Sequence, residues 1–242
     1  VKCPVFTFCV FDGVPGAVVS VMVADEIYGI DELNDAAATA LYGSRAAREG
    51  IIVTPDQRKK GVLQSTYSGY VGVEKVSSSL NLMNASQLKS YLTANNASFS
   101  PVDDLGSNTD WLKAIERSSA ISQNHNLSFS GGGDHSNYSA SINYLDKDGI
   151  LSGSNLKRLI TRLNLNQYAL NNKVKFVLNI ANAISKAAYV PLQNIVLIQA
   201  TKHLPVSPVK NADGSYFENF NTTGYFNPVA MLNHAQDNTK YN

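Results

Sequence analysis

The chain has 242 residues and a formal net charge of +1, and 44% of its residues are hydrophobic. This length allows one large or two modest domains, and the near-neutral charge supplies no basic patch of the kind that nucleic-acid binding requires. No apolar run approaches the ~18 residues of a spanning helix, which excludes a helical membrane protein. A transmembrane β-barrel stays open, because its short alternating strands leave the overall hydropathy low.

Residues 1–60 predict a small mixed α/β unit. The apolar run 4–12 is expected to form a strand that ends in a Gly/Pro turn, and 18–23 a second short extended piece. The run 51–54 is expected to form a buried strand. A charged connector at 55–61 then marks a boundary.

The segment 25–50 lies between these strands. It begins with acidic residues, is rich in alanine and ends with arginines. This order suits the macrodipole of a helix. Because Gly43 lies inside the alanine-rich part, the segment predicts one helix or two short helices.

From Val62 onward the pattern changes to long segments that alternate apolar and polar residues. In the third of them, one face carries Tyr138, Ile142 and Tyr144, whereas the other carries Ser141 and Asn143. A period of two is the signature of a β-strand whose faces meet different environments. Five such strands are expected, at 62–76, 122–131, 137–145, 156–168 and 173–183.

The connections between these strands alternate strictly between long and short. Such sorting is typical of outer-membrane barrels, which have short turns at one end and long loops at the other. The polar faces carry cations that would each cost ~2–4 kcal/mol against lipid at mid-depth, so they should line a wet interior; these are Arg158, Arg162, Lys173 and Lys175. An antiparallel sheet with one face in water gives the same alternation. The residues alone therefore leave a soluble sheet and a membrane wall open.

Several motifs occur in a fixed order along the chain. Residues 110–166 carry DW, NHNLS followed by Gly-Gly, Y-x-x-S-x-x-Y-x-x-x-x-G-I and R-x-x-x-R-x-N-L. Residues 31–54 read DELNDAAATALYGSRAAREGIIVT, and FDGVPG stands at 11–16. From about residue 5 to 185, this order resembles the plug and first barrel strands of the SusC/RagA family of TonB-dependent outer-membrane transporters. Departures from the family pattern lie in the first part, at Cys3, Cys9, Asn34, Arg48 and Glu49.

The resemblance implies a membrane all-β fold: an antiparallel transmembrane β-barrel with a small α/β plug domain. Plugged barrels of this class have about 22 strands, so the chain is interpreted as a fragment. Residues 1–60 would be the C-terminal part of the plug domain, and 61–242 the N-terminal part of the barrel. Long extracellular loops are expected at 77–121 and 189–242.

The resemblance also implies TonB-dependent active import of a nutrient, an oligosaccharide or a peptide, across the bacterial outer membrane. Implied partners are a SusD-type surface lipoprotein as a lid, outer-membrane lipid, and the TonB-ExbB-ExbD complex acting through a segment absent from this sequence. A dimer of transporter–lipoprotein pairs is a further assembly that the resemblance allows. No bond is made or broken, so neither enzymatic activity nor a cofactor is expected, and no nucleic acid is involved.

Two alternatives remain. The first is a secreted or surface-anchored β-rich adhesin that binds through polar strands and aromatic loops without transport. The second, a passive porin, is disfavoured because residues 1–60 predict a folded obstruction. Residues before Val1 would discriminate, since a TonB-contacting segment favours the transporter.

Aromatic residues in the expected long loops are the candidate ligand contacts. They could line a vestibule, or equally pack the loops together or contact a lid. The substrate-binding candidates are Trp111, Tyr216, Phe217 and Tyr225, with Phe220 and Phe226 beside them.

No metal site and no catalytic residue is expected. Asp146 begins a calcium-like loop, but the position that needs a bidentate Glu is Lys157, so a turn is expected. Cys3 and Cys9 lie on one extended segment roughly 20 Å apart, too far for a disulfide, and are interpreted as apolar fillers. The histidines are too widely spaced for a zinc site and are interpreted as surface or loop residues; they are His125, His135, His203 and His234.

Overall fold

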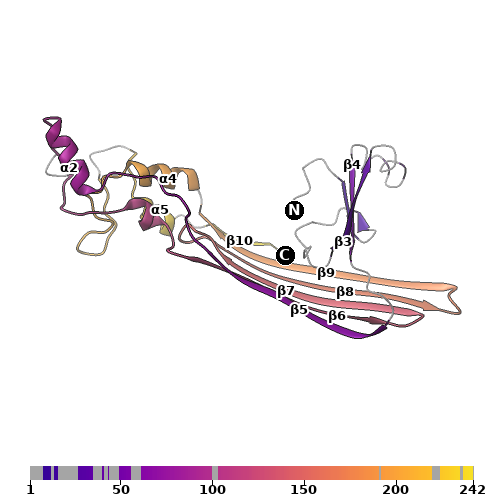
Figure 1. Ribbon diagram of the computed structural model, residues 1–242. Coiled ribbons are helices and arrows are strands. Elements are labelled where there is room, and N and C mark those ends of the chain that lie inside the picture. The colour runs from indigo at the N-terminus through magenta and orange to yellow at the C-terminus, as the bar shows by residue number, and fades with distance from the viewer. Residues whose placement is uncertain are drawn as a thin grey trace.

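The structure is a computed structural model, and its helices and strands form two sheets and a group of short helices (Figure 1). It describes residues 8–11, 14–15, 27–34, 40, 43, 49–55, 61–99, 103–190, 192–219, 224–234 and 237–241. The smaller sheet lies away from the helices, toward the other end of the long strands (Figure 1).

The smaller sheet has the strand order β2-β1-β4-β3. Its strands are β1 (Phe8–Phe11), β2 (Val14–Pro15), β3 (Ile27–Asn34) and β4 (Glu49–Pro55). β1 runs parallel to β4, and the other pairs are antiparallel. Val10 and Val53 are buried. The strands expected within 4–12 and at 51–54 are therefore confirmed.

The prediction of a helix from residue 25 onward is wrong for its first part. Residues 27–34 form β3, which pairs with β4 along its length, from Ile27 opposite Pro55 to Asn34 opposite Glu49. Pairing with a strand about twenty residues away along the chain outweighs the local helical preference, which is only a weak prior. The expected extended piece at 18–23, the side chains of Cys3 and Cys9, and most of 35–48 lie outside the described residues.

The larger sheet, called here the wall sheet, has the order β10-β9-β8-β7-β6-β5 with antiparallel pairs throughout. It is open, with β5 and β10 at its edges. Its strands are β5 (Gly61–Glu74), β6 (Ala120–Gly132), β7 (Ser136–Asp148), β8 (Asn155–Ala169), β9 (Val174–Tyr189) and β10 (Asp237–Tyr241). The five expected alternating strands are confirmed. β10 was missed, because the polar run DNTKY carries no alternation and was assigned to a loop.

The two faces of the wall sheet have the reverse of the usual exposure. On the apolar face, Ile142 is 44% and Ile180 50% exposed, whereas on the polar face Asn126 is 5% and Asn143 2% exposed. The Nδ2 of Asn143 donates to the Oδ1 of Asn124 at 2.7 Å, a hydrogen bond between side chains of neighbouring strands. A sheet folded for water would bury the apolar face instead.

The strand register makes the apolar face continuous. Phe129, Ala140, Leu163 and Ile180 lie directly beside one another on β6, β7, β8 and β9. Neighbouring rows carry Leu127 with Ile142, and Tyr144 with Leu159. Because a one-residue slip would move every side chain to the other face, this register fixes which surface is apolar.

The connections are sorted by end, as expected. At one end, β6 and β7 are joined by a tight turn in which the N–H of Gly133 donates to the carbonyl of Ser136 at 2.7 Å. β8 and β9 are joined at the same end by residues with positive φ, Leu170, Asn171 and Asn172. The longer connections and the helices lie at the opposite end, called here the loop end (Figure 1).

Within the described residues, four helices occur at the loop end: α2 (Ala85–Ala94), α3 (Trp111–Ile115), α4 (Gln193–Lys202) and α5 (Pro228–His234). α2 lies in the first long connection. It begins with a capping box, in which Asn84 accepts from the N–H of Gln87 and Gln87 accepts from the N–H of Asn84, an arrangement that satisfies free N–H groups of the first turn. None of the helices within the described ranges is long and apolar enough to cross a bilayer.

Candidate functional site

The loop end has a small hydrophobic core of its own, called here the loop cluster. It joins α3, α4 and α5, which come from two different long connections. Its buried members are Trp111, Leu112, Ile115, Val196, Ala200 and Leu232. Three short helices that could not persist alone are thus stabilised by sharing one apolar core.

Hydrogen bonds between remote segments hold the loop cluster together. The N–H of Thr109 donates to the carbonyl of Pro205 at 2.7 Å, and the hydroxyl of Thr109 donates to the backbone carbonyl of Ser207 at 2.7 Å. The indole N–H of Trp111 donates to the carbonyl of Leu204 at 3.0 Å. The first long connection is therefore fixed against the segment that follows α4.

A three-ring stack lies beside these bonds. His203 packs between Trp111, at 4.6 Å between ring centroids, and Tyr225, at 3.9 Å. The Nδ1 of His203 lies 2.8 Å from the carbonyl oxygen of Gln199, and because a carbonyl only accepts, Nδ1 carries the hydrogen. Burial lowers the pKa of His203 below its ordinary value of 6.5, only partly offset by this bond. The ring is therefore held neutral.

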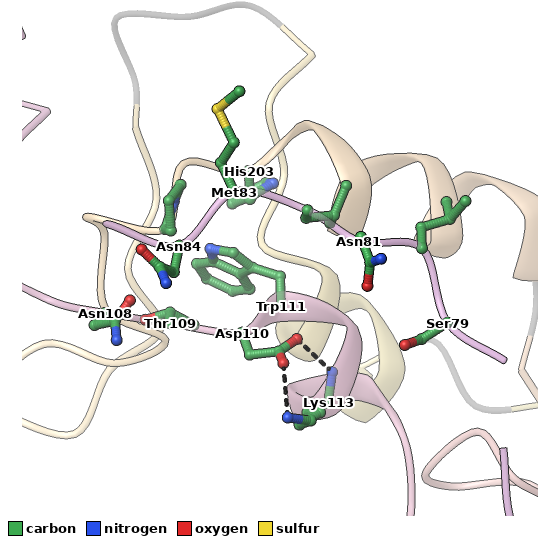
Figure 2. A pocket seen from close by; sticks show the side chains of 13 residues that line it. Ser79, Asn81, Met83, Asn84, Asn108, Thr109, Asp110, Trp111, Lys113 and His203 are labelled. Atoms are coloured by element: carbon green, nitrogen blue, oxygen red, sulfur yellow. Dashed lines mark hydrogen bonds and ion pairs between the residues drawn. The ribbon is translucent and has the colours of Figure 1, made fainter. Parts of the chain in front are cut away.

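A pocket of about 390 Å³ opens beside this stack (Figure 2). It is lined by the extended segment 79–84, by 108–111 and Lys113, and by His203 and Pro205. Most of the polar groups around it are already engaged within the chain: Asn108 accepts from the N–H of Ala85 at 3.0 Å, and Asp110 pairs with Lys113 at 3.2 Å (Figure 2). The pocket therefore has a mixed lining, in which the exposed apolar side chains of Leu80, Leu82 and Met83 lie beside polar groups that are mostly engaged within the chain.

The aromatic candidates do not form one site. Trp111 and Tyr225 meet through His203, and Trp111 is 2% exposed, so its ring packs the loops. Tyr216 lies elsewhere, edge-on to His234 at 5.6 Å, and its hydroxyl accepts from Asn233 at 2.7 Å. Phe217 is half-buried, Phe226 is exposed, and Phe220 lies outside the described residues. Contact of any of them with substrate stays a prediction.

Two buried polar residues organise the loop end, and neither is predicted from the sequence to be buried there. His203 was interpreted as a surface or loop residue, but it is buried in the stack because Trp111 and Tyr225 converge on it from remote segments. Asn227 is fully buried and satisfied on both sides of its amide: it donates to the carbonyls of Val209 and Phe217 and accepts from two N–H groups at the start of α5. A signal existed for Asn227, since Asn followed by Pro is a common helix start.

The calcium-like segment is a turn. Asp146 lies 3.1 Å from the ammonium of Lys157, and the N–H of Gly149 donates to the carbonyl of Ser154 at 3.0 Å. Arg117 holds the turn by donating to the carbonyls of Gly149 and Ser154 at 2.6 and 2.7 Å. Among the described residues, no group of three or more His, Cys, Asp or Glu side chains could hold a metal ion.

The polar face of the wall sheet is the second candidate surface. Toward its middle it carries neutral hydrogen-bonding side chains with one buried cation, Arg162. The remaining polar side chains there include Asn126, Ser130, Ser139, Asn143 and Asn164. Such amide and hydroxyl groups can both donate and accept, which suits the many neutral groups of sugars or peptides.

Solved structures share this architecture. The RagAB peptide transporter matches with a TM-score of 0.69 over 90% of this chain and 29% of that chain, at 20% identity. The RagAB peptide importer in its closed-closed state matches with a TM-score of 0.62 over 75% of this chain and 24% of that chain, at 23% identity. The fold is therefore an antiparallel transmembrane β-barrel with a plug domain, of which the wall sheet is an open part.

Curated relatives agree with the motifs. The TonB-dependent receptor SusC of Bacteroides thetaiotaomicron is 32% identical over 211 residues, 84% of this chain and 21% of its own length. The TonB-dependent receptor P3 of Formosa agariphila is 32% identical over 246 positions, 96% of this chain and 23% of its own length. The chain belongs to the SusC/RagA family. No protein-family model matches it, and this SusC/RagA chain spans roughly a fifth of the length of the curated relatives.

Proposed function

We propose that this chain forms part of a TonB-dependent importer that moves a nutrient, an oligosaccharide or a peptide, across the bacterial outer membrane. The function makes and breaks no covalent bond in its cargo. Residues 1–60 would contribute to the plug, and 61–242 to the barrel wall with its extracellular loops.

The reversed faces of the wall sheet carry this proposal. An exposed apolar surface that continues across four strands, β6 to β9, costs free energy in water and is stabilising against lipid. Along β7, Tyr138 and Tyr144 lie on that face roughly 20 Å apart, near the height of an apolar band between two aromatic girdles. The opposite face, which carries Asn126 and Asn143, then looks into the lumen.

The loop cluster supports an outward-facing role for the long connections. Its compact core and bonds between segments give the loop end a fixed shape, which suits a docking surface. A SusD-type lipoprotein that covers this end, and a TonB-ExbB-ExbD complex that acts on the plug, follow from membership of the family. The RagAB relatives are named as peptide transporters or importers, and a peptide is accordingly one of the two cargo classes to be tested.

The test uses the intact protein in its own cells. A strain that lacks the gene and a strain that lacks TonB are compared with the parent for depletion of an oligosaccharide mixture and of a peptide mixture from the medium, followed by mass spectrometry. We expect both deletions to abolish depletion of the same components, because import requires the barrel and the supply of force.

Localisation supplies the control. The protein should resist extraction by salt and alkali and should be released only by detergent. Recovery in the soluble fraction, with cargo bound but not taken up, would favour the adhesin instead. Uptake that needs the gene but not TonB would indicate a passive porin.

A further inference from the structure

A row of lysines crosses the apolar face of the wall sheet at its loop end. Lys157 on β8 is directly opposite Lys186 on β9, and Lys186 is directly opposite Lys240 on β10. Alternate residues of a strand share a face. Because Leu159 and Ile184 belong to the apolar face, Lys157 and Lys186, two positions along, lie on that face as well.

The row stands where the apolar surface ends. The next row toward the middle of the sheet consists of Tyr144, Leu159 and Ile184, and a step of two residues is about 7 Å along a strand. The end of the wall sheet opposite the loop end, where short turns join β6 to β7 and β8 to β9, is called here the turn end. From that row to the turn end, the apolar face of β6 to β9 carries no Asp, Glu, Lys or Arg within the described registers. Its row at the turn end, Ser136, Gln167 and Phe176, is also uncharged. The lysines therefore mark one boundary of the band and not the other.

The positive charge of the row is only partly balanced. The ammonium of Lys157 lies 3.1 Å from Asp146, which also accepts from the hydroxyl of Tyr144 at 3.2 Å. Asp148, one step further out, lies 4.0 Å from Arg117. Lys186 is exposed and makes no ion pair with any residue that the structure describes. Like charges directly opposite one another destabilise a sheet, so neighbouring lysines gain from an anion placed between them.

We propose that Lys157 and Lys186, the neighbouring lysines of β8 and β9, bind the phosphate group of an anionic lipid headgroup in the leaflet on the loop side. This inference rests on the proposed function, since it requires the apolar face to lie in a membrane. Each ammonium supplies up to three donors to phosphate oxygens. The acyl chains of the same lipid lie along the apolar rows that begin at Leu159 and Ile184. One molecule is thus held by charge at the headgroup and by apolar contact below it.

The experiment uses the intact protein, purified and placed in nanodiscs of phosphatidylcholine with a minor fraction of lipid A, a phosphorylated glycolipid. Native mass spectrometry then counts the lipid A molecules that each protein retains as lipid A is diluted. A lysine near an anionic surface contributes about five-fold in binding. We expect Lys186→Gln to weaken retention about five-fold and Lys186→Gln with Lys157→Gln to weaken it further, whereas Lys186→Arg retains it.

Lys175→Gln is the matched control, because Lys175 lies on the same strand but on the polar face, near the turn end. It should leave retention unchanged. Retention by the double variant equal to that of the unchanged protein would overturn the proposal, as would equal loss in Lys175→Gln. Displacement by inorganic phosphate at matched phosphate concentration would assign the row to free anions and likewise overturn a headgroup site. TonB-dependent uptake is measured in a separate experiment, so a failure of the proposed function is distinguished from a failure of the lipid site.

Discussion

The wall sheet and the loop cluster belong to one chain but place their side chains by opposite rules. In the loop cluster, Trp111 and Ile115 are buried and charged residues such as Lys113 face outward. In the wall sheet, Asn143 is buried and Ile142, its neighbour in sequence, is exposed. The same preference of apolar groups to avoid water explains both, provided that the surroundings differ.

The comparison indicates that an alternation of apolar and polar residues shows that the two faces of a strand meet different surroundings. It does not show which surroundings each face meets. The loop cluster is folded for water and draws its stability from a small buried core. The wall sheet draws its stability from hydrogen bonds between strands, and its apolar face is stable only against lipid. Substitutions should therefore have opposite consequences in the two regions.

Removal of the Trp111 ring should break the loop cluster. Trp111→Ala deletes a buried side chain and its bond to the carbonyl of Leu204, and we expect a loss of about 3–5 kcal/mol. Hydrogen exchange of the amides in α3, α4 and α5 measures the effect in the intact protein. Tyr91→Ala, at an exposed position on α2, should change protection by no more than about 0.5 kcal/mol. Equal effects of the two variants would contradict the role of Trp111 as a buried residue that stabilises the loop cluster.

A pair of neighbours on β9 tests the wall sheet. Ile180→Lys and Asn179→Lys introduce the same charge at consecutive exposed positions on opposite faces. In water both would be nearly neutral, but against lipid Ile180→Lys should cost about 2–4 kcal/mol. Denaturant unfolding from lipid vesicles gives the difference. Similar stabilities would mean that the apolar face does not meet lipid.

Substitutions of Asn227 test whether the stability of the loop cluster depends on buried hydrogen bonds as well as on buried apolar side chains. Asn227→Ala leaves two carbonyls and the start of α5 without their partner, which should cost about 1–3 kcal/mol. Asn227→Ser keeps a helix cap and should recover part of the loss. The protection of α5 amides is the measurement. No recovery would assign the whole effect to the two carbonyls.

The smallest effect concerns pH. Burial lowers the pKa of His203, so as the pH falls through 6.5 the unfolded chain binds a proton before the folded one. The stability of the loop cluster should be complete above this pH and should decrease below it, with no such slope in the wall sheet. His203→Phe should keep the ring stack and remove the slope. A slope that persists in His203→Phe would point to another group.

Much of the wall sheet could be predicted, because strand periodicity is local. The alternation in 137–145 located β7, and the spacing of the strands separated short connections from long ones. The same approach was wrong at 27–34, where the acidic start of an alanine-rich segment favoured a helix and pairing with β4 decided otherwise. It missed β10, because DNTKY has no alternation.

The candidate site was less accessible to prediction. Trp111 and Tyr225 were singled out as aromatic loop residues, but their shared contact with His203 depends on three segments that are remote in sequence. The lysine row likewise depends on contacts between segments that are remote in sequence. Lys157 and Lys186 belong to different strands, and only the register of β8 with β9 brings them together.

The sequence by itself determined the five long strands of the wall sheet, the sorting of long and short connections and the family, because each is written in local order and spacing. The tertiary structure decided which face of the wall sheet is buried, where the loop helices find their core and which charges lie side by side. The physical reason is that periodicity is a property of a single strand. The surroundings of a side chain depend on neighbours that may lie a hundred residues away, as Thr109 and Ser207 do.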